Sequence, residues 1–165
     1  MSNYGTVNGG NAYFDARLHA YDWDQAPVSD RQKALVQATE LIDQFDYVGE
    51  KYAVNLLGDD ATDEEKRVAR LSQPLEFPRG DVNEVPGEID QACYLIAKAL
   101  LSGRDPDMDL ESLATKAAAY GDVKTSYDRS GNIMEHLAHL IPSPQAWNLL
   151  KPFLRYRNKF DINKV

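Results

Sequence analysis

The sequence contains few of the residues that build metal or redox sites. Its 165 residues include one cysteine, Cys93, and three histidines. A single cysteine cannot form an internal disulfide, so a disulfide framework is excluded as the source of stability. Cys93 lies within an apolar stripe, where free cysteine usually fills space in a core. We therefore expect no bound cofactor, and synthesis in a reducing cytoplasm.

The short motifs of the common enzyme classes are also missing. The sequence has no Gly-x-Ser-x-Gly nucleophile elbow, no phosphate-binding glycine loop with lysine, and no dinucleotide fingerprint. His136 and His139 are spaced i, i+3, but further metal ligands at usable spacing are lacking, which favours solvent-facing or capping histidines. The acidic residues between Asp59 and Glu65 do not match a calcium loop. These absences predict a protein that is not an enzyme.

Excess positive charge and long apolar runs are absent as well. The formal charge is −8, from 26 acidic and 18 basic side chains, which argues against wholesale binding to a phosphate backbone. No apolar run approaches the roughly 20 residues that cross a bilayer, and the first ten residues are polar, so we expect neither a membrane span nor a signal peptide. At this length the chain is expected to build one compact core.

The clearest positive signals are two amphipathic helices. Apolar residues recur at helical spacing over 89–100, which predicts a helix from about Pro86 to Leu101 that ends at Gly103. A similar stripe predicts a helix from Ser29 to about Phe45, with Ser29 and Gln32 as a capping box. Burying both stripes against each other gives a small helical bundle. The inward side chains of the second stripe are predicted to be Ala34, Leu35, Ala38, Leu41, Ile42 and Phe45.

Shorter elements are predicted around these two helices. The fold class is therefore mainly α, with a short β-hairpin near 123–134 and an extended C-terminal arm. The predicted short helices are Asn11 to about Tyr21 with Leu18 and Tyr21 on the inward face, a helix capped by Thr62 with Val68 and Leu71 on its apolar face, Leu110 to Ala119, and a last helix capped by Ser143. The Gly9-Gly10 pair before the first helix is expected to be flexible.

A proline-rich loop at 73–80 is the first candidate docking element. Pro74 and Pro78 fix their own φ and push the preceding residues toward extended conformations, so the path of the loop is largely set by its sequence. A loop with a preset path loses less entropy when a partner binds it. We therefore predict subunit contacts at Phe77, Pro78 and Arg79.

The C-terminal residues 151–165 are the second candidate. They carry five basic side chains and the single acid Asp161, so their charge is opposite in sign to that of the whole chain. Aromatic and arginine side chains often anchor interfaces, which favours a docking arm over a solvated terminus. The same residue types could instead stack on bases and contact phosphates of single-stranded DNA. The predicted contact residues of this arm are Phe153, Arg155, Tyr156, Arg157 and Phe160.

A set of short pieces in a fixed order resembles a family of tailed-bacteriophage proteins. This family is the helical head-to-tail connector, also called adaptor or head-completion protein, whose relatives are sometimes labelled DnaT-like single-stranded-DNA-binding proteins. The segment from Tyr52 to Arg70 is longer than we expect for it. The matching pieces are Tyr4-Gly5-Thr6-Val7, Tyr13-Phe14-x-x-Arg17-Leu18, Trp23, Lys33-Ala34-Leu35-x-x-Ala38-Thr39-x-Leu41-Ile42-Asp43, Gln73 to Arg79, Val85-Pro86-x-x-Ile89-x-x-Ala92-x-x-x-Ala97 and Leu149-Leu150-x-Pro152-Phe153-Leu154.

The resemblance implies a place and partners for the chain. It implies a helical adaptor domain, here residues 1–150, followed by a docking arm at 151–165. It also implies a homo-oligomeric ring, commonly of twelve copies, in the neck of the virion between the portal protein and the first tail protein, a tail tube or nozzle protein. Double-stranded DNA would pass through the lumen without specific binding. A single-stranded-DNA-binding phage protein is the alternative function.

Overall fold

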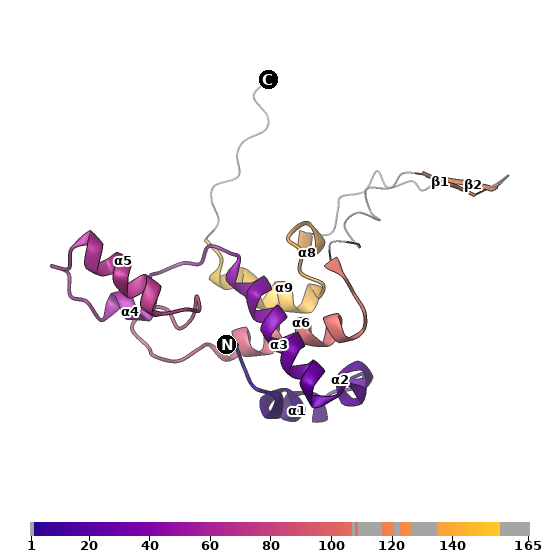
Figure 1. The fold of residues 1–165 in the computed structure, drawn as a ribbon, viewed down its shortest axis with the longest axis horizontal. Coiled ribbons are helices and arrows are strands. Elements are labelled where there is room, and N and C mark those ends of the chain that lie inside the picture. Colours follow the sequence, from indigo (N-terminus) through magenta and orange to yellow (C-terminus); the bar gives the residue numbers. More distant parts are fainter. Residues whose placement is uncertain (1, 107, 109–116, 121–122, 127–134, 156–165) are drawn as a thin grey trace, which may run out of the picture.

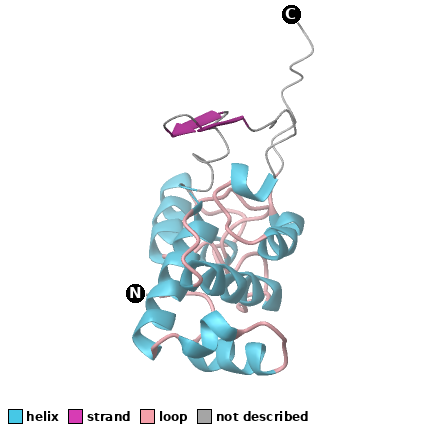
Figure 2. Cartoon of the chain, turned by 90° about the vertical axis from the view of Figure 1, so that its right-hand side faces the viewer, coloured by secondary structure: helices cyan, strands magenta, loops and turns pink. Residues whose placement is uncertain are grey.

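The computed structural model describes residues 2–106, 108, 117–120, 123–126 and 135–155, and helices dominate this part of the chain (Figures 1 and 2). The prediction of a mainly α fold is confirmed. The elements in chain order are α1 (Val7–Asp15), α2 (Tyr21–Gln25), α3 (Val28–Asp43), α4 (Tyr52–Asn55), α5 (Asp63–Ser72), α6 (Gly87–Leu101), β1 (Ala117–Tyr120), β2 (Val123–Ser126), α8 (Glu135–Ala138), α9 (Pro144–Leu150) and the 3-10 helix η1 (Lys151–Phe153).

The core is centred on α6, which packs against α3 and α9. α3 and α6 form the most extensive helix pair, as the two amphipathic stripes predict, and α9 packs on α6. α9 begins as predicted, because the Ser143 hydroxyl accepts a hydrogen bond from the Ala146 N–H at 3.3 Å. The fully buried side chains from the two stripes are Leu35, Ala38 and Ile42 of α3 and Ile89, Ala92, Cys93, Ile96 and Ala97 of α6.

Cys93 is a core residue, as its place in the apolar stripe predicts. Its thiol is fully buried and contacts the hydroxyl of Thr39, with the two atoms 3.8 Å apart. Burial raises the pKa of the Cys93 thiol to about 12. At neutral pH the side chain therefore remains an uncharged thiol and a poor nucleophile.

The N-terminal helix begins earlier than the sequence predicts. α1 starts at Val7, because the Thr6 hydroxyl accepts a hydrogen bond from the Gly9 N–H at 2.9 Å and caps the helix. The Gly9-Gly10 pair is therefore helical, and the expected flexible segment is wrong. A Cβ atom at Gly10 would lie 2.4 Å from the indole ring of Trp23, which is fully buried. Glycine here allows Trp23 to pack directly on the backbone of α1.

Replacing Gly10 with alanine should destabilise the protein, although alanine favours helices. The new methyl group has to displace the buried Trp23 ring, a cost of about 1–3 kcal/mol for overpacking, which exceeds the propensity gain of about 1 kcal/mol. Gly87→Ala in α6 is the matched control, since a Cβ atom there would have no neighbour within 4 Å. Thermal denaturation of both variants measures the effect. A Gly10 variant as stable as the Gly87 variant would contradict this account of the packing.

The predicted single helix over residues 11–21 is two helices, α1 and α2. Between them His19 has a φ of +62°, in the left-handed region, which turns the chain. Leu18 and Tyr21, predicted to face inward, are 86% and 71% exposed. α3 also starts differently, at Val28, with Pro27 at the N-cap and no side-chain cap from Ser29, so the predicted capping box there is wrong.

The β-hairpin lies earlier in the chain than predicted. Val123–Ser126 is a strand, but it pairs antiparallel with the preceding Ala117–Tyr120 and not with a following strand. The hairpin expected near 123–134 is therefore not seen, and the return strand assigned to 133–134 lies outside the described residues. The end of the helix predicted over 110–119 is wrong, because residues 117–119 belong to β1, and its other residues lie outside the described part.

α4 and α5 form a small helical hairpin that projects from the bundle (Figure 1). α5 has the predicted start, because Thr62 and Glu65 form a complete capping box. Its predicted apolar face is not covered: Val68 and Leu71 are 54% and 71% exposed. This hairpin occupies the segment 52–70 that is longer than the family resemblance leads us to expect.

Candidate functional site

The loop at 73–80 is fastened to the body of the protein through Arg79. The guanidinium donates hydrogen bonds to the backbone oxygens of Tyr47 and Val48, each at 3.2 Å, and to that of Gly49. It also forms an ion pair with Glu76 at 2.6 Å, and its side chain is only 12% exposed. Arg79 therefore supplies hydrogen-bond donors to three consecutive backbone carbonyl oxygens, those of residues 47–49.

Phe77 occupies the centre of an aromatic cluster on the same side of the bundle. Its side chain is 3% exposed. Its ring centroid lies 4.7 Å from that of Tyr47, 5.7 Å from that of Phe153 and 6.1 Å from that of Tyr4, with edge-to-face geometry in each pair. This cluster joins the N-terminal segment, the segment that follows α3, the loop and the C-terminal segment.

A partly buried hydrogen-bonded pair also holds the loop, at Phe77. The Tyr4 hydroxyl donates to the Asp43 carboxylate and accepts a hydrogen bond from the Phe77 N–H at 3.0 Å. Burial raises the pKa of Tyr4 and also that of Asp43, where the hydrogen bond from Tyr4 partly opposes the effect. The loop path is thus set by contacts with three distant segments as well as by its prolines.

The subunit contacts predicted at Phe77, Pro78 and Arg79 stay a prediction. Within this chain the side chains of Phe77 and Arg79 are turned inward and are 3% and 12% exposed. Pro78 is half-buried, and its carbonyl accepts hydrogen bonds from the Tyr52 N–H at 3.0 Å and the Gln73 side chain at 2.9 Å. The prolines predict a preset loop path, but they do not predict which side of the loop faces the core.

The C-terminal segment is part of the body up to Arg155. Phe153 packs on Phe77, the Val48 N–H donates to the Phe153 oxygen, and the Arg155 N–H donates to the Asp46 oxygen, both at 2.9 Å. Of the two predicted contact residues in 151–155, Phe153 is half-buried and Arg155 is exposed. The other three predicted residues, Tyr156, Arg157 and Phe160, lie outside the described residues.

An aromatic hollow lies beside this segment. It has a volume of about 370 Å³, and its lining includes Phe45, His139, Trp147 and Arg155. The His139 ring is exposed and stacks on Trp147, with the centroids 4.5 Å apart and the planes at 21°. Sequence reasoning missed this stack, because His139 and Trp147 were not placed on one face.

Many basic side chains form ion pairs with carboxylates of the same chain. Among the described residues, six basic side chains form ion pairs within 4 Å, and two of these, Lys51 and Arg79, share one acid, Glu76. Much of the positive charge on the described body is therefore neutralised locally, in agreement with the negative net charge. The pairs are Lys33 with Asp30, Lys51 with Glu76, Arg67 with Glu64, Arg70 with Glu50, Arg79 with Glu76 and Lys151 with Glu135.

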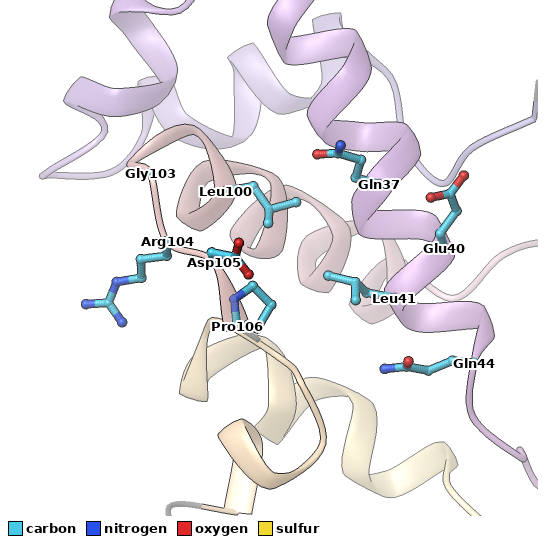
Figure 3. Close-up of a pocket in the computed structure, with 9 residues that line it drawn as sticks. All are labelled: Gln37, Glu40, Leu41, Gln44, Leu100, Gly103, Arg104, Asp105 and Pro106. Carbon is cyan, nitrogen blue, oxygen red and sulfur yellow. The ribbon is translucent and has the colours of Figure 1, made fainter. Parts of the chain in front are cut away.

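A larger cavity of about 640 Å³ lies between α3 and the end of α6 (Figure 3). Gln37, Glu40 and Leu41 of α3 and its C-cap residue Gln44 line it, with Leu100 opposite. Its polar side chains include no nucleophile with an adjacent base, so the cavity does not assemble a catalytic constellation. In the described part of the chain, no group of three or more histidine, cysteine, aspartate or glutamate side chains could hold a metal ion.

The comparisons place the chain in a family. A family model described as "Putative DnaT-like ssDNA binding protein" matches residues 2–164. The chain belongs to this family. No curated protein and no solved structure matches it. Among the described residues, no helix is both long enough and apolar enough to cross a membrane. The DnaT-like family agrees with part of the resemblance seen in the sequence, while a head-to-tail connector remains a prediction.

Proposed function

We propose that this DnaT-like chain is a structural protein of a tailed bacteriophage, a head-to-tail connector that forms a ring in the neck of the virion. Its partners would be the portal protein above and a tail tube or nozzle protein below. Double-stranded DNA would pass through the ring without specific contacts. In this proposal the chain makes or breaks no bond in a bound molecule, and residues from Tyr156 onward supply the contact to the portal.

The observation that carries this proposal is the combination of paired basic side chains and exposed apolar side chains on the described surface. Many of its basic side chains are paired with acids of the same chain, whereas large apolar side chains such as Leu18 and Leu71 are 86% and 71% exposed. Strong binding to nucleic acid needs positive charge that is free to neutralise phosphates. Exposed apolar groups around a rigid body suit contacts with other proteins. An acidic lumen wall would also repel a DNA duplex and let it slide.

Single-stranded DNA binding is the second candidate function, and two observations favour it. The description of the family names this activity and does not name a connector. The exposed His139 ring, stacked on Trp147 beside Arg155, could add a nucleobase to the stack and place a cation near its phosphate. This site would work with the basic residues after Arg155.

One pair of experiments separates the two functions. Mass photometry of the full chain with the portal protein of the same phage should show portal particles that gain several copies, and antibody labelling should mark the neck of purified virions. The second experiment measures binding of a fluorescent oligo(dT) by anisotropy between about 50 and 200 mM salt, where a true phosphate contact weakens steeply. Unlabelled necks together with salt-sensitive oligo(dT) binding would reject the connector in favour of the second function.

A further inference from the structure

A small hollow lies where α2, the end of α6 and the segment before α9 meet. It has a volume of about 280 Å³. Two basic side chains line it, Lys98 from the last turn of α6 and Arg104 from the segment that follows. Arg104 also borders the larger cavity, but in Figure 3 its guanidinium points away from the α3 side chains that line that cavity. The small hollow therefore gathers two cations on an acidic chain.

Neither cation has an acidic partner among the described residues. Lys98 and Arg104 take part in none of the ion pairs within 4 Å, whereas six other basic side chains do. Arg17 and Arg31 donate instead to backbone oxygens. The ammonium of Lys98 and the guanidinium of Arg104 therefore keep hydrogen-bond donors that no described residue uses.

The end of α6 does not use these two side chains as a cap. A lysine in the last turn of a helix often bonds to the final carbonyl oxygens. Here the Ser102 N–H donates to the Lys98 oxygen at 3.1 Å, and the Arg104 N–H donates to the Ala99 oxygen at 3.3 Å. The Ser102 hydroxyl donates to the same Ala99 oxygen at 2.7 Å. These carbonyl oxygens are satisfied locally, so both cations remain available to a ligand.

Another wall of the hollow is preset by its sequence. It consists of Pro142, Ser143, Pro144 and Gln145. The prolines on both sides of Ser143 restrict the backbone, and Ser143 is only 8% exposed. Its hydroxyl oxygen accepts a hydrogen bond from the Ala146 N–H at 3.3 Å, which orients the hydroxyl and leaves its proton for donation. An anion in the hollow would therefore meet a hydroxyl donor as well as two cations.

One acidic side chain, Asp22 of α2, lines the same hollow. None of the ion pairs of the described residues joins it to Lys98 or Arg104. Two positive side chains and one negative side chain leave the lining with a formal charge of +1. The hollow therefore attracts an anion, and Asp22 weakens that attraction.

We propose that this hollow binds one phosphate group. The Arg104 guanidinium can donate two parallel hydrogen bonds to phosphate oxygens, and the Lys98 ammonium adds a second positive charge. Donors on three segments, with the Ser143 hydroxyl as the third, can each engage a separate oxygen of a phosphate, whereas a carboxylate offers only two oxygens. The phosphate is either free, as inorganic phosphate or on a nucleotide, or part of a nucleic-acid backbone. The proposal goes beyond the connector function, which assigns no bound ligand to the chain.

The test titrates the full chain with inorganic phosphate. The amide NMR signals of Ser102, Arg104 and Gln145 should shift and saturate with phosphate, and sodium chloride at matched ionic strength should not reproduce the shifts. Lys98→Met removes the ammonium but keeps an apolar stem, and Arg104→Gln removes the guanidinium. Each variant should raise the dissociation constant for phosphate at least tenfold. Lys66→Met is the control and should bind like the wild type, because Lys66 lies on α5, outside the hollow.

Asp22→Asn tests the sign of the electrostatic argument. Removing this carboxylate should lower the dissociation constant for phosphate several-fold, because it removes a repulsion and keeps the size of the side chain. A purely structural role of these residues predicts changes in melting temperature without opposite effects on phosphate binding. Unchanged affinity in both Lys98→Met and Arg104→Gln would overturn the proposal, as would amide shifts that chloride reproduces.

Competition with DNA identifies the source of the phosphate. If it belongs to a nucleic-acid backbone, inorganic phosphate should displace fluorescent oligo(dT), and the same two variants should weaken oligo(dT) binding. Oligo(dT) that binds equally well to both variants, or not at all, assigns the site to free phosphate or a nucleotide. The connector function has its own readout, since labelled virion necks combined with no phosphate binding would reject only this site.

Discussion

Replacing Arg79 with alanine is expected to lower the free energy of unfolding by about 3 kcal/mol, the lower end of the usual loss for a buried ion pair, because this pair is only partly buried. The variant leaves the backbone oxygens of Tyr47, Val48 and Gly49 without their donor and deprives Glu76 of a cation at 2.6 Å. For a chain of this size, a loss of this order lowers the melting temperature by roughly 10 °C. Thermal and urea denaturation measure both quantities.

Arg67→Ala provides the matched control. Arg67 also pairs with a glutamate three residues earlier, at 2.6 Å, but its side chain is 62% exposed, so its removal should cost less than about 1 kcal/mol. The comparison separates a buried guanidinium from an exposed one with the same partner spacing. If Arg79→Ala melted like the wild type and lost only self-association, the residue would belong to a subunit contact, as the sequence alone suggested.

Truncation after Leu150 is the second change with a large expected effect. It removes Phe153 from Phe77, and it removes two backbone hydrogen bonds, from Val48 to Phe153 and from Arg155 to Asp46. The loss of a packed aromatic ring together with these hydrogen bonds should lower the free energy of unfolding by about 3–5 kcal/mol. Circular dichroism during thermal denaturation gives the measurement.

A cut after Arg155 is the control for this truncation. It keeps every contact of the segment 151–155 with the body, so stability should equal that of the full chain. Loss of portal binding in this shorter truncation would assign the docking role to residues 156–165 without a change in the fold. Equal melting temperatures for the two truncations would contradict the packing of Phe153.

The helical core could be predicted from sequence because its signal is local. The stripes of α3 and α6 repeat at the period of the helix, so they identify both the helices and their inward faces. The caps at Thr62 and Ser143 are also local, since each hydroxyl bonds to the N–H three residues later. Such patterns are complete within a few residues and do not depend on the rest of the fold.

The candidate site could not be predicted in the same way, because it depends on contacts between distant segments. Arg79 reaches residues that precede it by about thirty positions, and Phe77 meets Tyr4 and Phe153. No periodic pattern encodes these contacts. The exposed position of Leu18 was missed for a related reason: an apolar residue next to a helix is expected to be buried, and only the fold shows that none of the described elements covers it.

The order in which this chain leaves the ribosome has a consequence for its folding. The Tyr4 hydroxyl cannot bond to the Phe77 N–H until that residue, 73 positions later, has been synthesised. The buried face of α3 likewise cannot pack until α6, which ends at residue 101, has been made. Residues up to about Leu101 must therefore emerge before α6 can cover the apolar face of α3. Until then the apolar face of α3 is exposed on the nascent chain, and such exposed surface promotes aggregation and is what chaperones protect.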